Sequence, residues 1–104
     1  MSTFPMRLLA TAEADNILLV KALIQHPNHN GLGRTPEGKP IPPHHLTEVV
    51  VSVNGEPRTT LKAGSGMAAN PLFGWRVAGK PGDSVSVGWR DNLGNQGCAA
   101  IVVR

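Results

Sequence analysis

Four histidines have the type and spacing that could hold a metal ion. His26 and His29 stand three positions apart, and the adjacent pair His44 and His45 follows later in the chain. If the ends of the segment between them meet above a sheet, three or four imidazoles could reach one zinc, copper or iron ion. Adjacent histidines on an extended chain point to opposite sides, however, and histidine ligands need rigid support. The alternative is that these are loop and strand-edge histidines, solvated or hydrogen-bonded, and we expect no metal or other cofactor.

Cys98 is the single cysteine of the chain, so an internal disulfide is excluded. A reactive thiol needs exposure and a helix N-terminus or a cation beside it. The sequence instead places Cys98 between Gly97 and Ala99 in a predicted strand, where a small buried or edge residue is expected. No Ser–His–Asp order, paired carboxylates or phosphate-binding loop is found either. We therefore predict no catalytic residue and no enzyme.

The totals of the sequence favour one small domain of short strands. The chain has 104 residues, which suits one domain spanning residues 1–104, and its 12 Gly and 9 Pro favour turns over long helices. Its net charge of +3 comes from singly scattered residues, with no basic run for nucleic acid. No apolar run is long enough to span a bilayer, and Met1–Met6 does not have the pattern of a signal peptide. Taken alone, the sequence predicts a cytosolic protein that binds neither nucleic acid nor membrane.

Alternating apolar residues predict about seven short β-strands. Turn-forming residues separate most of them, with Asn54-Gly55 as the strongest hairpin signal and Lys80–Asp83 as a turn built on Pro and Gly. This pattern is typical of an all-β, immunoglobulin-like β-sandwich. The predicted strands are Met6–Glu13, Ile17–Gln25, Leu46–Val53, Arg58–Ala63, Leu72–Ala78, Ser84–Arg90 and Gly97–Val103.

The predicted strand Ile17–Gln25 departs from strict alternation. One of its faces carries Leu18, Val20, Ala22 and Ile24, as expected for a core strand. The opposite face carries two further leucines, at positions 19 and 23. A strand that is apolar on both faces is usually buried on both, so we expect this strand to be covered on both sides near its middle.

Two loops are the candidates for partner binding. The longer one, Gln25–Leu46, holds five of the nine prolines and is predicted to lie as an irregular loop across one end of the sandwich. Its Pro40, Ile41 and Pro42 are candidate contacts, because proline lowers the entropic cost of ordering a loop on binding. Met67, within the second loop at residues 64–71, and Leu72, directly after it, are expected to be exposed and to contribute to the same kind of interface.

A series of short motifs runs from Met6 to Val102. They are His26-Pro27, Gly31-x-Gly33-Arg34, Lys39-Pro40-Ile41-Pro42, His45-Leu46, Asn54-Gly55, Asn70-Pro71-Leu72, Pro81-Gly82-Asp83 and Trp89-x-Asp91-Asn92-x-Gly94. Each motif is weak alone, but their order on a chain of this length is fairly specific. Together they resemble the SoxZ family, the Z subunits of the SoxYZ carrier of sulfur-oxidising bacteria.

The resemblance implies a scaffold subunit that forms a heterodimer with SoxY. In that family SoxY carries thiosulfate-derived sulfur on a cysteine in a Gly-rich C-terminal arm, and SoxZ does not hold it. No such arm ends this sequence, so Cys98 is not carried over as the sulfur-bearing residue. The resemblance also implies docking of other Sox enzymes and a periplasmic location, reached by export with a signal-bearing partner. The rival hypothesis is a small metal- or redox-active protein that uses the four histidines.

Overall fold

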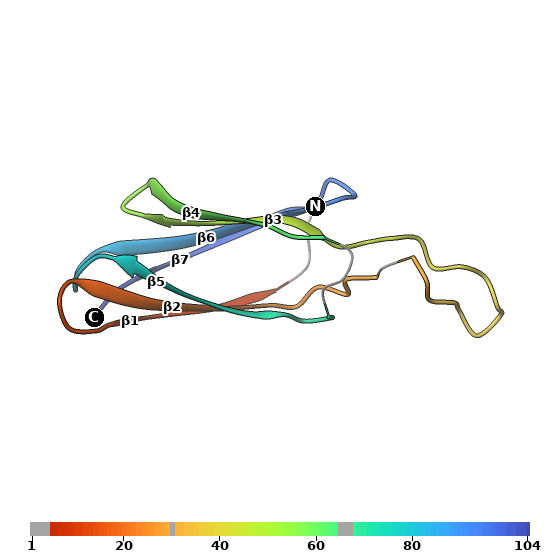
Figure 1. Cartoon of the computed structure of the whole chain (residues 1–104), viewed down its shortest axis with the longest axis horizontal. Coiled ribbons are helices and arrows are strands. Elements are labelled where there is room, and N and C mark those ends of the chain that lie inside the picture. Colours follow the sequence, from red (N-terminus) through yellow and green to blue (C-terminus); the bar gives the residue numbers. More distant parts are fainter. Residues whose placement is uncertain (1–4, 30, 65–67) are drawn as a thin grey trace.

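Two antiparallel sheets form the structure (Figure 1), a computed structural model that describes residues 5–29, 31–64 and 68–104. One sheet has the order β1-β2-β5 and the other the order β4-β3-β6-β7. The predicted immunoglobulin-like sandwich is confirmed. Each predicted strand begins and ends within two residues of the corresponding observed strand. No helix among the described residues could cross a membrane. The strands are β1 (Met6–Ala12), β2 (Ile17–Ile24), β3 (Leu46–Val53), β4 (Glu56–Lys62), β5 (Leu72–Ala78), β6 (Ser84–Asp91) and β7 (Gln96–Val102).

The core lies between the two sheets and follows the alternation of the sequence. Every second residue of β2 and β6 points inward, as does every second residue of β3 from Val49 on, after an irregularity between Leu46 and Glu48. Each inward Leu, Ile or Val stabilises the fold by about 1.5–3 kcal/mol. The turns also form as predicted, with positive φ at Asn54, Gly55 and Gly82. The inward apolar residues of these three strands are Leu18, Val20, Ala22, Ile24, Leu46, Val49, Val51, Val53, Val85, Val87 and Trp89.

The long loop between β2 and β3 folds back on itself instead of remaining irregular. His29 and His44 exchange two backbone hydrogen bonds of 2.8 Å, and the N–H of Ile41 donates to the carbonyl of Gly33 at 2.9 Å. Prolines cannot donate to a ladder, so the pairing stays interrupted and forms no regular strands. We call residues 27–45, apart from residue 30, which lies outside the described part, the projecting hairpin.

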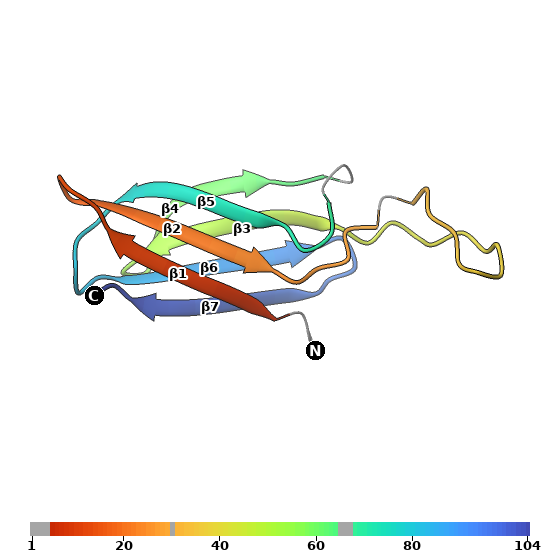
Figure 2. The ribbon, with the colours of Figure 1, turned by 90° about the horizontal axis from the view of Figure 1, so that it is seen from below.

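The projecting hairpin extends away from the sandwich, along its long axis (Figures 1 and 2). The molecule is 53 Å long but only 24 Å and 19 Å across, and the hairpin accounts for one end of that length. The expectation that this loop lies across the end of the sandwich is therefore wrong. Its two halves pair with each other and not with a sheet edge, which directs the chain outward.

The second face of β2 is less covered than its sequence predicts. Leu19 and Leu23 are half-buried and Lys21 is exposed, because the described part of the chain places no element over the outer face of the three-stranded sheet (Figure 2). The expectation of cover on both sides is wrong for this chain by itself. Its apolar pattern therefore requires another explanation.

Gly97, opposite Trp89, leaves no room for a larger side chain. A Cβ atom on Gly97 would lie 2.6 Å from Nε1 and 2.7 Å from Cε2 of the Trp89 indole, whereas one on Gly88 would meet nothing closer than 3.7 Å. We expect Gly97→Ala to lower the free energy of unfolding by about 1–3 kcal/mol, through forced displacement of the indole. Urea unfolding measures this, and the matched Gly88→Ala variant should stay within about 0.5 kcal/mol of the parent. Equal effects of the two substitutions would contradict the packing argument.

Candidate functional site

A buried carboxylate at the end of β6 is the centre of the polar site. The side chain of Asp91 is fully buried, and its Oδ2 accepts hydrogen bonds from Nε2 of His26 at 2.9 Å and from Nε2 of His44 at 2.7 Å. The side-chain amide of Asn95 donates to the same oxygen at 3.0 Å. Oδ1 accepts from the backbone N–H groups of Leu93 at 3.0 Å and Asn95 at 2.9 Å. Five donors thus replace the water that the carboxylate loses on burial.

The two histidines reach Asp91 from different parts of the fold. His26 follows β2 in the three-stranded sheet, and His44 precedes β3 in the four-stranded sheet. The rings of His26 and His44 meet edge to face at 4.7 Å, and His26 packs in the same way on Trp89 at 5.7 Å. One carboxylate therefore joins both sheets and both ends of the projecting hairpin.

The hydrogen bonds of His26 fix the position of its ring proton. Its Nδ1 accepts the backbone N–H of Asn28 at 3.1 Å, so that nitrogen carries no proton. The proton lies on Nε2, where it is donated to Asp91. His26 is therefore a neutral, fully buried hydrogen-bond donor.

Two asparagines complete the base of the projecting hairpin. Asn28, held at a positive φ of 47°, accepts the N–H of Leu46 at 3.0 Å and donates to the carbonyl of Ala68 at 2.9 Å. Asn92 accepts the N–H of His45 at 2.8 Å and donates to the carbonyl of Pro43 at 2.9 Å. These side chains satisfy backbone groups that interrupted strand pairing would otherwise leave open.

Opposing effects act on the ionisation of Asp91. Burial by itself raises the pKa of this carboxyl, but the hydrogen bonds from His26, Asn95 and His44 outweigh it and hold the pKa far below its ordinary value. Asp91 is accordingly a carboxylate at any physiological pH.

The geometry favours hydrogen bonding over metal coordination. His26, His44 and Asp91 do offer three possible ligand atoms within 4.8 Å of one another. However, a metal on Nε2 of His26 would move the ring proton to Nδ1, against the N–H of Asn28, so that two donors would face each other. Of the four histidines, the structure thus brings together two, around a carboxylate.

The remaining histidines lie apart from this cluster. His29 is exposed. The two hydrogen bonds described above join its backbone to the backbone of His44. His45 is half-buried, and its Nδ1 lies 3.0 Å from the carbonyl oxygen of Leu46. The pair His44 and His45 indeed points in different directions, as the extended backbone predicts.

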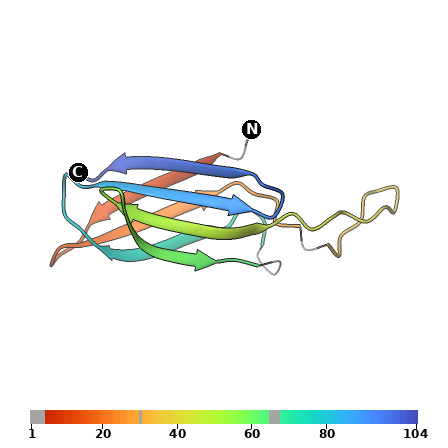
Figure 3. The same ribbon diagram turned by 90° about the horizontal axis from the view of Figure 1, so that it is seen from above.

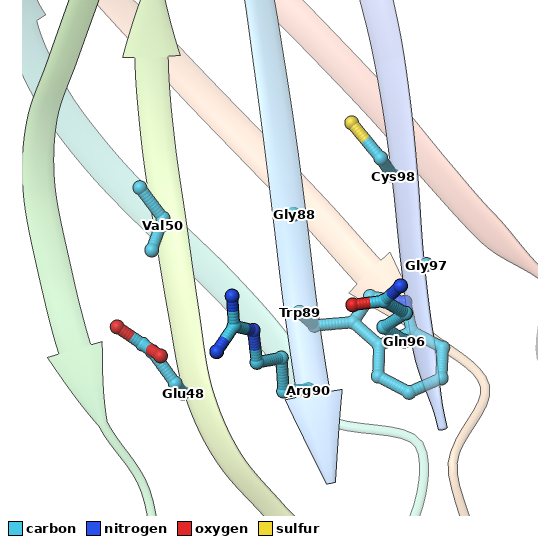
Figure 4. A pocket seen from close by; sticks show the side chains of 8 residues that line it. All are labelled: Glu48, Val50, Gly88, Trp89, Arg90, Gln96, Gly97 and Cys98. Atoms are coloured by element: carbon cyan, nitrogen blue, oxygen red, sulfur yellow. The ribbon is translucent and has the colours of Figure 1, made fainter. Parts of the chain in front are cut away.

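Cys98 is exposed on the edge strand β7. Of the two positions expected for it, buried in a strand or at an edge, the structure shows the edge position. It borders a hollow of about 550 Å³ (Figure 4). The hollow lies on the outer face of the four-stranded sheet, the sheet that faces the viewer in Figure 3. Gly88 forms the floor, between Val50 and Cys98, and Glu48 and Arg90 stand at one end. Among the described lining residues no histidine that could act as its base is found.

The candidate partner contacts are spread over two regions. Pro40 and Pro42 are exposed on the projecting hairpin, while Ile41 between them is half-buried. Leu72 begins β5 and is 68% exposed on the outer face of the three-stranded sheet, as predicted. Met67 lies outside the described residues.

Asp91, Asn28, Asn92 and Asn95 are site residues that were not candidates from the sequence. From the sequence, Asp91 is interpreted as the first residue of a turn, because residues 91–95 are Asp-Asn-Leu-Gly-Asn, a segment rich in turn-forming residues. A usable signal was the alternation of β6, which places Asp91 inward after Val87 and Trp89. The same parity carries β2 on from Ile24 to His26.

The fold and the site together define a class: an all-β immunoglobulin-like sandwich whose buried polar cluster fixes a projecting hairpin. Residues 6–101 match the family model of the sulphur oxidation protein SoxZ, and the chain belongs to the SoxZ family. It therefore has a role in the sulfur oxidation system. A search of curated proteins finds no match.

Replacing the carboxylate of Asp91 tests the cluster. Asp91→Asn keeps the shape but turns an NH₂ group towards donors, and we expect it to lower the free energy of unfolding by about 3 kcal/mol or more. Urea unfolding at neutral pH measures this loss. Asp83→Asn is the matched control, because Asp83 also accepts hydrogen bonds but lies near the surface. A loss no larger than that of the control would contradict the structural role of Asp91.

The depressed pKa of Asp91 also predicts a pH dependence. A carboxyl whose folded pKa lies below its unfolded pKa, about 3.9, stabilises the fold fully above that value. This contribution is lost as the pH falls further, towards the folded pKa. The stability gap between the parent and Asp91→Asn should therefore be constant near neutrality and should narrow below about pH 4. A gap that widens in acid would contradict the assignment.

The ring tautomer of His26 predicts weak metal binding. Adding Zn²⁺, Cu²⁺ or Ni²⁺ at neutral pH should leave the melting temperature of the protein unchanged, because coordination at His26 would break two hydrogen bonds. Thermal unfolding with and without chelator measures this. A rise of several degrees that disappears in His26→Gln and His44→Gln would establish a metal site instead.

Proposed function

We propose that this chain is the non-catalytic scaffold subunit of a carrier pair in the sulfur oxidation system. Its partner is a SoxY-type chain, which holds the sulfur substrate on a cysteine of its own. The observation that carries the proposal is the family match over residues 6–101. The match covers all seven strands except Val102, the last residue of β7. The match thus concerns the whole sandwich.

The polar site supports a scaffold role. Its histidines donate to Asp91 and its asparagines hold backbone groups, so these side chains are used to fix the shape of the molecule. A shape fixed before binding costs less conformational entropy when a partner docks. The sandwich then serves the complex through its rigid surfaces.

The projecting hairpin supports the same role. It carries Pro40 and Pro42 in exposed positions, and its base is tied to both sheets through Asp91 and Asn28. A stiff segment beside an interface can limit the directions from which further enzymes approach a carrier. In this proposal the hairpin guides that docking, and the complex acts in the periplasm after export together with the signal-bearing partner.

Co-expression with a SoxY-type chain tests the pairing and the location together. We expect one co-eluting 1:1 complex in size-exclusion chromatography, recovered from the periplasmic fraction only when the partner carries its signal peptide. Micromolar mixtures that elute as two separate peaks would overturn the pairing. Recovery in the cytoplasm beside an exported partner would overturn the location.

A further inference from the structure

The outer face of the three-stranded sheet gathers apolar side chains that this chain leaves open. Strand register makes them neighbours, since Leu23 pairs with Arg7 on one side and with Leu72 on the other. Lys21 pairs with Leu9 in the next row. We call this surface the leucine face; it consists of Arg7, Leu9, Leu19, Lys21, Leu23 and Leu72.

The leucine face is exposed where the sequence expects burial. Leu9 is 56% and Leu72 is 68% exposed, and a shallow, mainly apolar hollow of about 210 Å³ lies between them. The apolar residues of β2 on both faces are typical of a strand with cover on both sides. Only the inner cover comes from the described part of the chain, so the pattern indicates an outer cover supplied by another molecule.

Other exposed apolar residues do not form such a surface. Leu32 lies on the projecting hairpin, Leu93 in the turn between β6 and β7, and Val102 at the end of β7. Single apolar residues on separate elements are usual for a protein surface. The leucine face differs because leucines from three adjacent strands are contiguous.

The charges of the leucine face indicate the chemistry of its partner. Arg7 and Lys21 stand within it, and no ion pair among the described residues involves either of them. The acid on the same sheet, Glu13, is engaged by Arg76 at 2.9 Å. The complementary surface is apolar opposite the leucines and carries carboxylates opposite Arg7 and Lys21.

We propose that the leucine face is the surface on which the partner subunit packs. The inference rests on the proposed function, which makes that subunit the SoxY-type chain. The leucines of β1, β2 and β5 supply the buried apolar part of the contact. Arg7 on the edge strand β1 and Lys21 on the central strand β2 meet carboxylates of the partner. The outer face of the four-stranded sheet stays open for other contacts.

Substitutions on the two sheet faces test this assignment with equal changes in charge. Leu9→Glu and Leu72→Glu place a carboxylate in the leucine face, and we expect each to weaken binding of the purified SoxY-type chain roughly 10- to 100-fold. Val102→Glu is the matched control, because Val102 is 60% exposed on the four-stranded sheet. It should change the dissociation constant less than about threefold. All three sites are exposed, so circular dichroism should find the variants folded.

A variant without the two basic charges and a footprinting experiment on the parent complex complete the test. Arg7→Gln with Lys21→Gln should slow association and remove most of its salt dependence. Hydroxyl-radical footprinting of the parent complex should protect Leu9 and Leu72 but not Val102.

The outcomes separate this inference from the proposed function. If the parent chain does not bind the SoxY-type chain, the proposed function fails. If the parent binds and Leu9→Glu and Leu72→Glu bind equally well, the pairing stands and the leucine face is not its surface. Loss of binding in Val102→Glu alone would assign the contact to the four-stranded sheet and overturn the inference.

Discussion

A buried negative charge sets the main constraint on this molecule. The carboxylate of Asp91 has no access to water, so the fold must bring donors to it from every side. Two of these donors are histidines at the roots of the projecting hairpin, and the others belong to the turn after β6. The position of the hairpin, the closure of the two sheets at this end and the shape of that turn thus depend on one side chain.

The rest of the molecule divides its surfaces by chemistry. The four-stranded sheet presents small residues such as Gly88 and Cys98 around an open hollow. The three-stranded sheet presents leucines between basic side chains. Burial of apolar side chains stabilises a contact roughly in proportion to the area removed from water, so leucines contribute more than glycine or alanine would. Under the proposed function, the leucine face can therefore specify where and how a partner subunit sits.

The fold followed from the sequence because its signals are local. Alternation over seven or eight residues defines each strand, and Asn54-Gly55 defines a turn with two residues. The site did not follow, since its members are far apart in the chain and look ordinary in their own segments. The residues next to His26 and His29 do not indicate which of the two histidines turns inward. The alternation of β2 does, because it places His26 on the same face as Ile24. Asp91 was hidden in the same way, as the inward residue of a strand whose end resembles a turn.

The Asp91 cluster has one further consequence, which concerns the covalent chemistry of the chain. It joins segments 65 and 47 residues apart, a closure that other small domains make with a disulfide. With Cys98 as its single cysteine, this chain achieves the closure with hydrogen bonds to a carboxylate. No oxidant forms this crosslink, and no thiol or sulfur compound breaks it by exchange. The link between the two sheets at this end is thereby independent of the redox state of its surroundings.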